Sequence, residues 1–140
     1  MTDLTKDQLI HLADAKLHDA KLLLAAGRGE SAYYLAGYSV ELMLKAIASK
    51  TIQAEAIPSR EFIRDILTHD FERLVRLARL TDALKTQVDL EPEFAARWQI
   101  VGEWDEQSRY EFRTLAEAET LIEAIEHANY GVLQWLQARL

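Results

Sequence analysis

The chain has 140 residues, enough for one domain with its own core, and its formal net charge is −7. It has no cysteine, which excludes disulfides and cysteine-ligated metals and fits a reducing compartment. The N-terminus, MTDLTKDQL, lacks the apolar core of a signal peptide, and no apolar stretch is long and uncharged enough to span a membrane. We therefore expect a cytoplasmic protein. Few glycines and prolines, with abundant alanine, leucine, glutamate and arginine, predict an all-α fold.

The negative charge is concentrated in the last third of the chain. Residues 1–50 and 51–88 each carry six acidic and six basic residues, whereas residues 89–140 carry eleven acidic and four basic ones. An acidic surface repels nucleic acid, so this third is a poor general surface for binding it. A local basic site elsewhere in the chain remains open.

Two long helices are predicted in the first third. Thr5 and Gln8 form a capping-box pattern, and apolar residues then recur at helical spacing over Lys6–Ala26, up to the GRG motif. The next predicted helix, Ser31–Ser49, is apolar nearly all the way round. Such a helix belongs at the centre of a bundle.

The remaining elements are shorter until the end of the chain. Gly102–Arg113 has no clear period and predicts a loop. Thr114 and Glu117 form a second capping-box pattern, which opens one long helix, Leu115–Arg139, of about 37 Å. Between these and the first third, the patterns predict helices at Arg60–Leu67, Asp70–Leu80, Thr81–Val88 and Pro92–Val101. Together they predict a single domain, residues 1–140, built as a helical bundle.

Glu41 and Lys45 are the two charges inside the most apolar helix. At a spacing of four residues they share one face and can form an ion pair. One interpretation is an ordinary pair on a narrow polar strip. The other is a polar patch that faces a cleft or a subunit interface.

The segment SRYEFR, residues 108–113, is the second candidate. Arg109 offers a planar fork for phosphate or carboxylate, and Tyr110 offers a face for stacking. The alternative is a loop that aromatic side chains anchor to the bundle, with Arg109 bonded to a carboxylate of the chain.

Arg64 and His69 are the third candidate. A metal-independent ribonuclease needs a histidine to move protons and an arginine to hold the phosphoryl group. On one helix the two would point about 140° apart, so they converge only if the break at LTHD redirects the chain. The alternative is a histidine that simply precedes a helix. No glycine-rich phosphate loop and no metal-binding motif is present, so we expect neither a cofactor nor a metal.

Three segments together resemble the HEPN family, the higher eukaryotes and prokaryotes nucleotide-binding domain. YYLAGYSVELMLKA (Tyr33–Ala46) is similar to the family's second helix with its Glu-x3-Lys, and LTHDFERLVRLA (Leu67–Ala78) is similar to the start of its next helix. QSRYEF, followed by a long last helix, resembles its C-terminal part. The resemblance implies a four- to five-helix, largely up-and-down bundle that is commonly dimeric. Family members include ribonuclease toxins and partners of small nucleotidyltransferases.

The family's ribonuclease signature is an arginine followed after four to six residues by a histidine at the start of a later helix. Here the later region has Arg109 without a histidine, and only Arg64 and His69, in an earlier segment, have the spacing. The resemblance therefore favours binding over cleavage, through Glu41, Lys45, Arg109, Tyr110 and Tyr38.

The preferred hypothesis is a binding module for a nucleotide or nucleic acid that acts with a partner protein such as a nucleotidyltransferase. The alternatives are a toxin-type ribonuclease that uses Arg64 and His69, and a dimerisation module without a ligand. We expect a homodimer, with the aromatic residues of Phe94–Trp104 available for its interface. We also expect Arg109 to reach Glu41 and Lys45, so that the three charges form one network.

Overall fold

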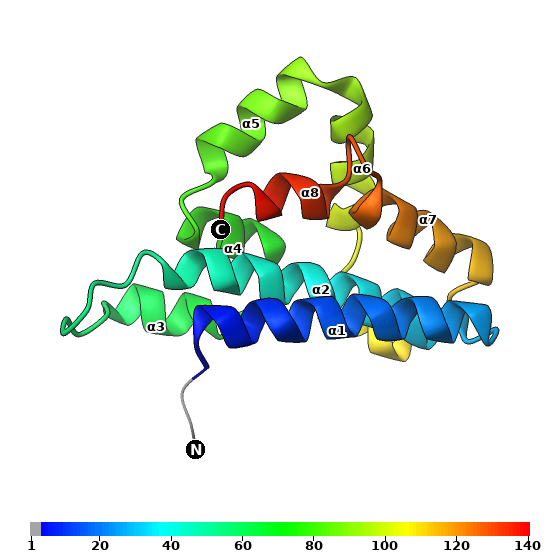
Figure 1. The fold of residues 1–140 in the computed structure, drawn as a ribbon, viewed down its shortest axis with the longest axis horizontal. Helices are drawn as coiled ribbons and strands as arrows, with labels where there is room; N and C mark the ends of the chain where they lie inside the picture. Colours follow the sequence, from blue (N-terminus) through cyan, green and yellow to red (C-terminus); the bar gives the residue numbers. More distant parts are fainter. Residues whose placement is uncertain (1–3) are drawn as a thin grey trace.

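The computed structural model describes residues 4–140, and this part of the chain contains helices and no strand. The predicted all-α fold is confirmed. Figure 1 shows how the elements are arranged. The described residues form eight α-helices and one short 3₁₀-helix, η1, in the order α1 (Lys6–Ala25), α2 (Gly29–Ser49), α3 (Arg60–Ile66), α4 (Phe71–Leu77), α5 (Thr81–Leu90), α6 (Pro92–Gly102), η1 (Glu106–Tyr110), α7 (Leu115–Glu126) and α8 (Val132–Gln137).

Helices α1 and α2, the two long helices predicted in the first third, form an antiparallel hairpin. The Thr5 side chain accepts a hydrogen bond from the Gln8 backbone, and the Gln8 side chain accepts one from the Thr5 backbone, which completes the predicted capping box. At the other end Gly27 has φ +78°, and the Arg28 N–H donates to the Leu23 carbonyl. This is a Schellman end, whose left-handed residue is usually glycine. It turns the chain directly into α2.

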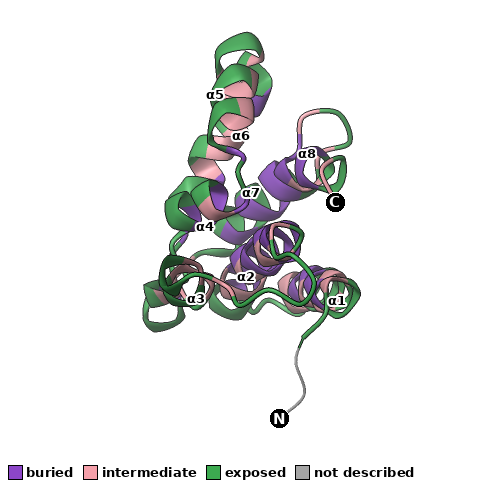
Figure 2. Ribbon diagram, turned by 90° about the vertical axis from the view of Figure 1, so that its left-hand side faces the viewer, coloured by how far each residue is buried: buried purple, intermediate pink, exposed green. Residues whose placement is uncertain are grey.

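Helix α2 is the centre of the fold. Most of its residues are buried, because it packs against α1, α4, α7, α8 and η1. Figure 2 shows α2 between α1 on one side and α4 and α7 on the other. Burying a polar group without a hydrogen-bond partner costs free energy. The buried polar side chains of α2 therefore need partners inside the protein.

Helices α5 and α6 lie at the edge of the molecule. Figure 1 shows them as an arm above α4 and α8, and α5 has no fully buried residue. Pro92 occupies the first turn of α6, as predicted. Among the described helices none is long and apolar enough to cross a membrane.

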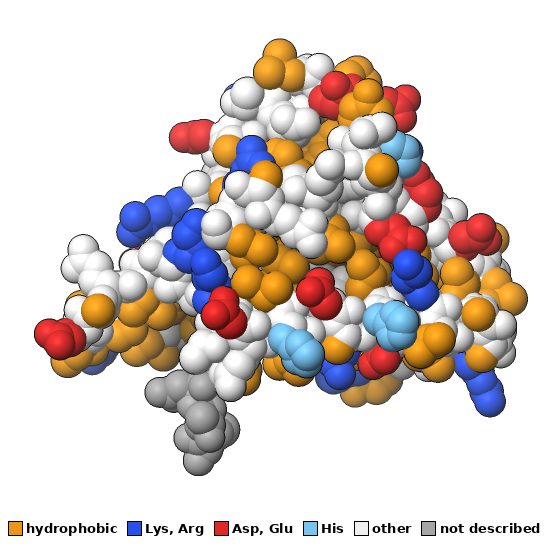
Figure 3. Space-filling model, viewed as in Figure 1, with side chains coloured by type: hydrophobic (Ala, Val, Ile, Leu, Met, Phe, Trp, Pro, Cys, Tyr) orange, Lys and Arg blue, Asp and Glu red, His pale blue; other side chains and the backbone are white. Residues whose placement is uncertain are grey.

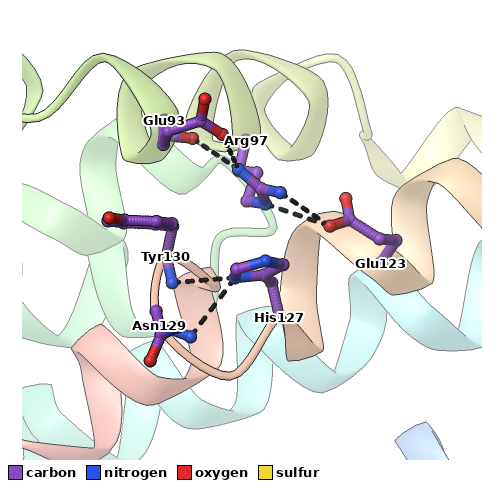
Figure 4. A network of polar contacts seen from close by, with 6 residues as sticks. All are labelled: Glu93, Arg97, Glu123, His127, Asn129 and Tyr130. Atoms are coloured by element: carbon purple, nitrogen blue, oxygen red, sulfur yellow. Dashed lines mark hydrogen bonds and ion pairs between the residues drawn. The ribbon is translucent and has the colours of Figure 1, made fainter.

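The predicted continuous helix Leu115–Arg139 is wrong, because the chain turns between α7 and α8. The ring nitrogen Nδ1 of His127 accepts hydrogen bonds from the backbone N–H groups of Asn129 (3.2 Å) and Tyr130 (3.0 Å), as Figure 4 shows. A Cβ at Gly131 would lie 2.5 Å from the His127 carbonyl oxygen, so only glycine fits this position. The His127 side chain and the missing Cβ of Gly131 together allow the turn.

The segment predicted as a loop, Gly102–Arg113, contains η1 and is anchored at Trp104. Trp104 and Phe94 are buried within the chain itself, and Trp98 is half-buried. Phe94 and Trp104 are therefore core residues. The prediction that these two side chains are available for a dimer interface is wrong.

Candidate functional site

The predicted ion pair on α2 is present. Lys45 Nζ lies 3.3 Å from Glu41 Oε2, and the Glu41 side chain is only 1% exposed. A carboxylate at this depth needs its charge balanced within the protein. Lys45 supplies one partner.

His69 supplies the other partner. Its Nδ1 lies 2.8 Å from Glu41 Oε1, and its Nε2 lies 3.3 Å from Glu106 Oε2 on η1. A neutral imidazole can donate to only one of these two carboxylates, whereas an imidazolium can donate to both. We call Lys45, Glu41, His69 and Glu106 the Glu41 cluster. It joins α2, the start of α4 and η1.

The break between α3 and α4 positions His69. The Asp70 side chain accepts a hydrogen bond from the Arg73 N–H at 3.2 Å and so caps α4. The preceding residues leave the helical path, and the His69 ring turns back toward α2. The predicted break at LTHD thus does redirect the chain, but toward Glu41.

A stack of aromatic rings fixes η1 against α2. The Trp104 ring lies 5.2 Å from Phe71 and 5.8 Å from Tyr34, and Tyr34 lies 6.1 Å from Tyr38. Trp104 can pack here because α2 has Gly37 at the contact, where an added Cβ would lie 2.3 Å from the indole ring. This packing places Glu106 beside His69. Burial raises the pKa of Tyr38, and the charge of Glu41 adds to that effect.

Arg109 and Tyr110 lie on the surface of η1. The Arg109 guanidinium lies 4.9 Å from the centre of the Tyr110 ring. Arg109 forms no ion pair with Glu41 or with any other acidic side chain of residues 4–140. The expected network of Glu41, Lys45 and Arg109 is therefore wrong, and His69 is the third member instead. Arg109 instead borders a small cavity of about 300 Å³, lined by Leu23, Glu30, Ser31, Tyr34 and Leu35.

Arg64 and His69 line different cavities in this structure. Arg64 Nε lies 3.1 Å from Asp65 Oδ1, and its side chain is 70% exposed. Arg64 lines a cleft between α3 and α4, whereas His69 lines the adjoining cavity between the start of α4 and η1. The contacts of the His69 ring are with Glu41 and Glu106.

The cleft between α3 and α4 is the feature that the sequence analysis missed. It has a volume of about 750 Å³, and four of its ten lining residues are arginines: Arg64, Arg73, Arg76 and Arg79. We call it the arginine cleft; its other lining residues are Thr51, Ser59, Glu61, Phe62, Asp65 and Leu77. Figure 3 shows basic side chains gathered at the left-hand end of the molecule, near α4 and the end of α2. Residues 51–88 carry equal numbers of acidic and basic residues, so their charge count gave no indication of these four arginines.

Two acidic residues near the arginine cleft are already engaged. Asp65 pairs with Arg64, and Asp70 caps α4. Arg73, Arg76 and Arg79, by contrast, form no ion pair with any described residue. With four arginines and two carboxylates, Glu61 and Asp65, in its lining, the cleft is positively charged although residues 51–88 as a whole are balanced.

No group of three or more acidic or histidine side chains within residues 4–140 could hold a metal ion. No protein-family model, curated protein or solved structure matches this chain.

Proposed function

We propose that the protein is a HEPN-like binding module for a nucleotide or nucleic acid, and that the arginine cleft is its ligand surface. The supporting observation is that Arg73, Arg76 and Arg79 line one concave surface without an acidic partner among the described residues. A guanidinium presents its N–H groups in a planar fork that fits the oxygens of a phosphate. Three unpaired forks on one cleft favour a ligand with several phosphate groups.

The net negative charge of the chain restricts where a phosphate-bearing ligand can bind. With a net charge of −7, most of the surface repels a polyanion. A phosphate-bearing ligand is therefore held only where positive charge is locally concentrated. This is the local basic site that the charge distribution left open.

The Glu41 cluster has a supporting role in this proposal. Both carboxylate oxygens of Glu41 are occupied by Lys45 and His69, so Glu41 is not free to contact a ligand. The cluster holds the start of α4 against α2, and α4 carries Arg73 and Arg76. Arg109 and Tyr110 are exposed and remain candidates for contact with the ligand or a partner.

The remaining family expectations belong to the same proposal: a largely up-and-down bundle, a cytoplasmic homodimer and a nucleotidyltransferase partner. The antiparallel α1–α2 hairpin, with α7 against α2, is consistent with such a bundle. Exposed apolar side chains near η1 support a protein interface there, notably Phe112, which is 95% exposed, and Tyr110.

The test is direct binding. Fluorescence anisotropy should detect binding of a labelled oligoribonucleotide or of a labelled nucleoside triphosphate, and affinity should fall as salt rises. Arg73→Ala and Arg76→Ala should weaken binding, whereas Arg28→Ala should not. Arg28 is an exposed arginine at the opposite end of α2, about 30 Å away at 1.5 Å per residue. Binding to neither probe would favour a dimerisation module without a ligand.

The ribonuclease alternative is examined in the same samples. One observation favours it: a buried carboxylate orients the His69 ring, as acidic residues orient catalytic histidines. Cleavage of the oligoribonucleotide in the presence of a metal chelator, abolished by His69→Ala and by Arg64→Ala, would establish this function. Intact RNA after prolonged incubation would exclude it for the isolated protein.

A further inference from the structure

We propose that the arginine cleft is the middle of a continuous track for single-stranded nucleic acid, and that Arg79 keeps a strained backbone in order to contact a phosphate there. The inference rests on the proposed function and narrows its ligand class. It assigns several adjoining nucleotides to the site, whereas a single nucleotide would satisfy the proposed function.

Three cavities adjoin one another along α3 and α4. A cavity of about 260 Å³ beside residues 51–58 shares Thr51, Ser59, Phe62 and Arg79 with the arginine cleft. On the other side, the cavity of about 440 Å³ that contains His69 meets the cleft at Arg73. The order is therefore loop cavity, arginine cleft, His69 cavity. A mononucleotide fills one of these spaces, whereas an extended strand can occupy all three.

Along the track, surfaces that can stack on bases lie on either side of arginines that can bind phosphates. The loop cavity offers apolar and aromatic surface at Phe62, Pro58 and Ile57, whose side chain is 94% exposed. The centre offers arginines, and the far cavity offers the half-exposed ring of His69. Proteins that bind single strands combine stacking surfaces for bases with positive charge for the backbone.

The acidic residues that line the track are largely committed to the protein itself. Asp105 accepts from the Gln107 N–H at 2.8 Å, and Glu106 contacts His69. Together with the pairing of Asp65 and the capping by Asp70, this leaves Glu61 as the one lining carboxylate of the described track with no ion pair or side-chain hydrogen bond. The positive charge of the track is concentrated in the arginine cleft, where four arginines face two carboxylates, Glu61 and Asp65.

Arg79 is the second, independent observation. Its φ is +61°, in the left-handed region that side chains disfavour. It occupies the Schellman position that ends α4: its N–H donates to the Arg76 carbonyl, and the Leu80 N–H donates to the Val75 carbonyl. Helix α1 ends with the same pair of bonds, and there the position is Gly27.

The Arg79 side chain makes no contact within the described residues that would offset the strain of its backbone. The Arg79 side chain is exposed and forms no hydrogen bond or ion pair with residues 4–140. Strained residues of this kind concentrate at functional sites. Since Arg79 lines both the arginine cleft and the loop cavity, a phosphate that crosses between them lies within reach of its guanidinium.

Arg79→Gly tests the assignment, because glycine relieves the backbone strain while it removes the guanidinium. We expect the unfolding midpoint of Arg79→Gly to rise and its affinity for a labelled hexauridylate to fall about tenfold. The slope of log affinity against log salt should become shallower by about 0.7, the value for one phosphate contact on a single strand.

Two matched variants complete the experiment. Glu55→Gly relieves a similar left-handed residue, with φ +64°, in the neighbouring loop, but Glu55 lines none of the three cavities. Arg28→Ala removes one positive charge far from the track. Both should bind hexauridylate within twofold of the wild-type protein. Arg76→Gln, which leaves the backbone unstrained, should lose affinity as Arg79→Gly does.

The length of the probe separates this inference from the proposed function. Affinity should rise from a uridine dinucleotide to hexauridylate, and hexauridylate should bind more tightly than uridine triphosphate. Equal affinity for the triphosphate and the hexamer would overturn the track and leave the proposed function intact. Wild-type affinity in both Arg79→Gly and Arg76→Gln would overturn the track and also the assignment of the ligand to the arginine cleft. Binding to no probe would overturn both.

Discussion

Glu41 Oε1 lies 2.8 Å from Nδ1 of His69, although 28 residues separate the two along the chain. The second oxygen of the same carboxylate lies 3.3 Å from Lys45 Nζ, one turn further along α2. A single buried carboxylate thus joins the centre of α2 to the residue just before the cap of α4. The position of α4, and with it the arginine cleft, depends on this contact.

Glu41→Ala should be the most damaging change in the Glu41 cluster. It leaves Lys45 and His69 without their shared partner, and breaking a buried ion pair in this way costs about 3–5 kcal/mol of unfolding free energy. Denaturation with guanidinium chloride measures the loss. The large effect is expected because Lys45, which is left without its partner, is itself only 16% exposed.

Glu106→Ala is the matched control for that measurement. Glu106 contacts the other nitrogen of the same His69 ring, but its side chain is 39% exposed. Solvent already screens this contact, so its removal should cost at most about 1 kcal/mol. If the two variants lost equal stability, Glu41 would not be the centre of the cluster.

Local patterns in the sequence predicted several elements well. Both capping boxes, at Thr5 and Thr114, are present, and the i,i+4 pair of Glu41 and Lys45 forms as its spacing indicated. These features depend only on residues within one turn of a helix, so spacing alone is sufficient to find them. The burial of α2 was likewise visible, since it is apolar on nearly every face.

Features that depend on distant residues were not predictable in this way. The contact between His69 and Glu41 requires two elements to meet, and the sequence analysis expected Arg109, from the predicted loop, in the place that His69 takes. The break between α7 and α8 was missed because Val132 and Trp135 continue the apolar stripe past His127, so periodicity does not register the turn. The arginine cleft was missed because a charge count over a segment does not show which side chains gather on one surface.

Gly37→Ala should destabilise the protein through Trp104. The added Cβ would lie 2.3 Å from the indole ring, so the ring or helix α2 must move. Overpacking of this kind typically costs about 1–3 kcal/mol. Denaturation measures the loss, and a change in the near-ultraviolet circular dichroism of the tryptophans should accompany it.

Gly102→Ala provides the comparison within the same region. Gly102 is the last residue of α6, and a Cβ there would meet no atom within 4 Å. Its stability should equal or slightly exceed that of the wild-type protein, because alanine is the better helix former. A loss as large as that of Gly37→Ala would contradict the packing argument.

The start of α7 should weaken in acid. A hydrogen bond from the Thr114 backbone N–H, followed by one from the Arg113 guanidinium, lowers the pKa of Glu117 below its usual value of 4.5. A group with a depressed pKa in the folded state contributes stability that is complete above the unfolded pKa. That contribution is lost as pH falls through the folded pKa.

Glu117→Gln isolates this contribution. At pH 7 the variant should be less stable than the wild-type protein, and the difference should shrink as pH falls below about 4.5. Thermal unfolding at a series of pH values gives the comparison. A difference that stays constant down to pH 2.5 would mean that the charge of Glu117 does not contribute, and that the capping geometry alone matters.

Because α1 and α4 both end in a Schellman motif, substitutions at the equivalent positions Gly27 and Arg79 should change stability in opposite directions. Gly27 has φ +78°, and no atom lies within 4 Å of where its Cβ would be, so Gly27→Ala is penalised by conformation alone. It should lose about 1 kcal/mol, the cost of a left-handed residue with a side chain. Arg79→Gly, in the equivalent position of α4, should gain about the same amount. Guanidinium denaturation of both variants measures the two changes. Loss of stability in both would mean that the Arg79 side chain stabilises the fold, and the strain at Arg79 would then need no ligand to explain it.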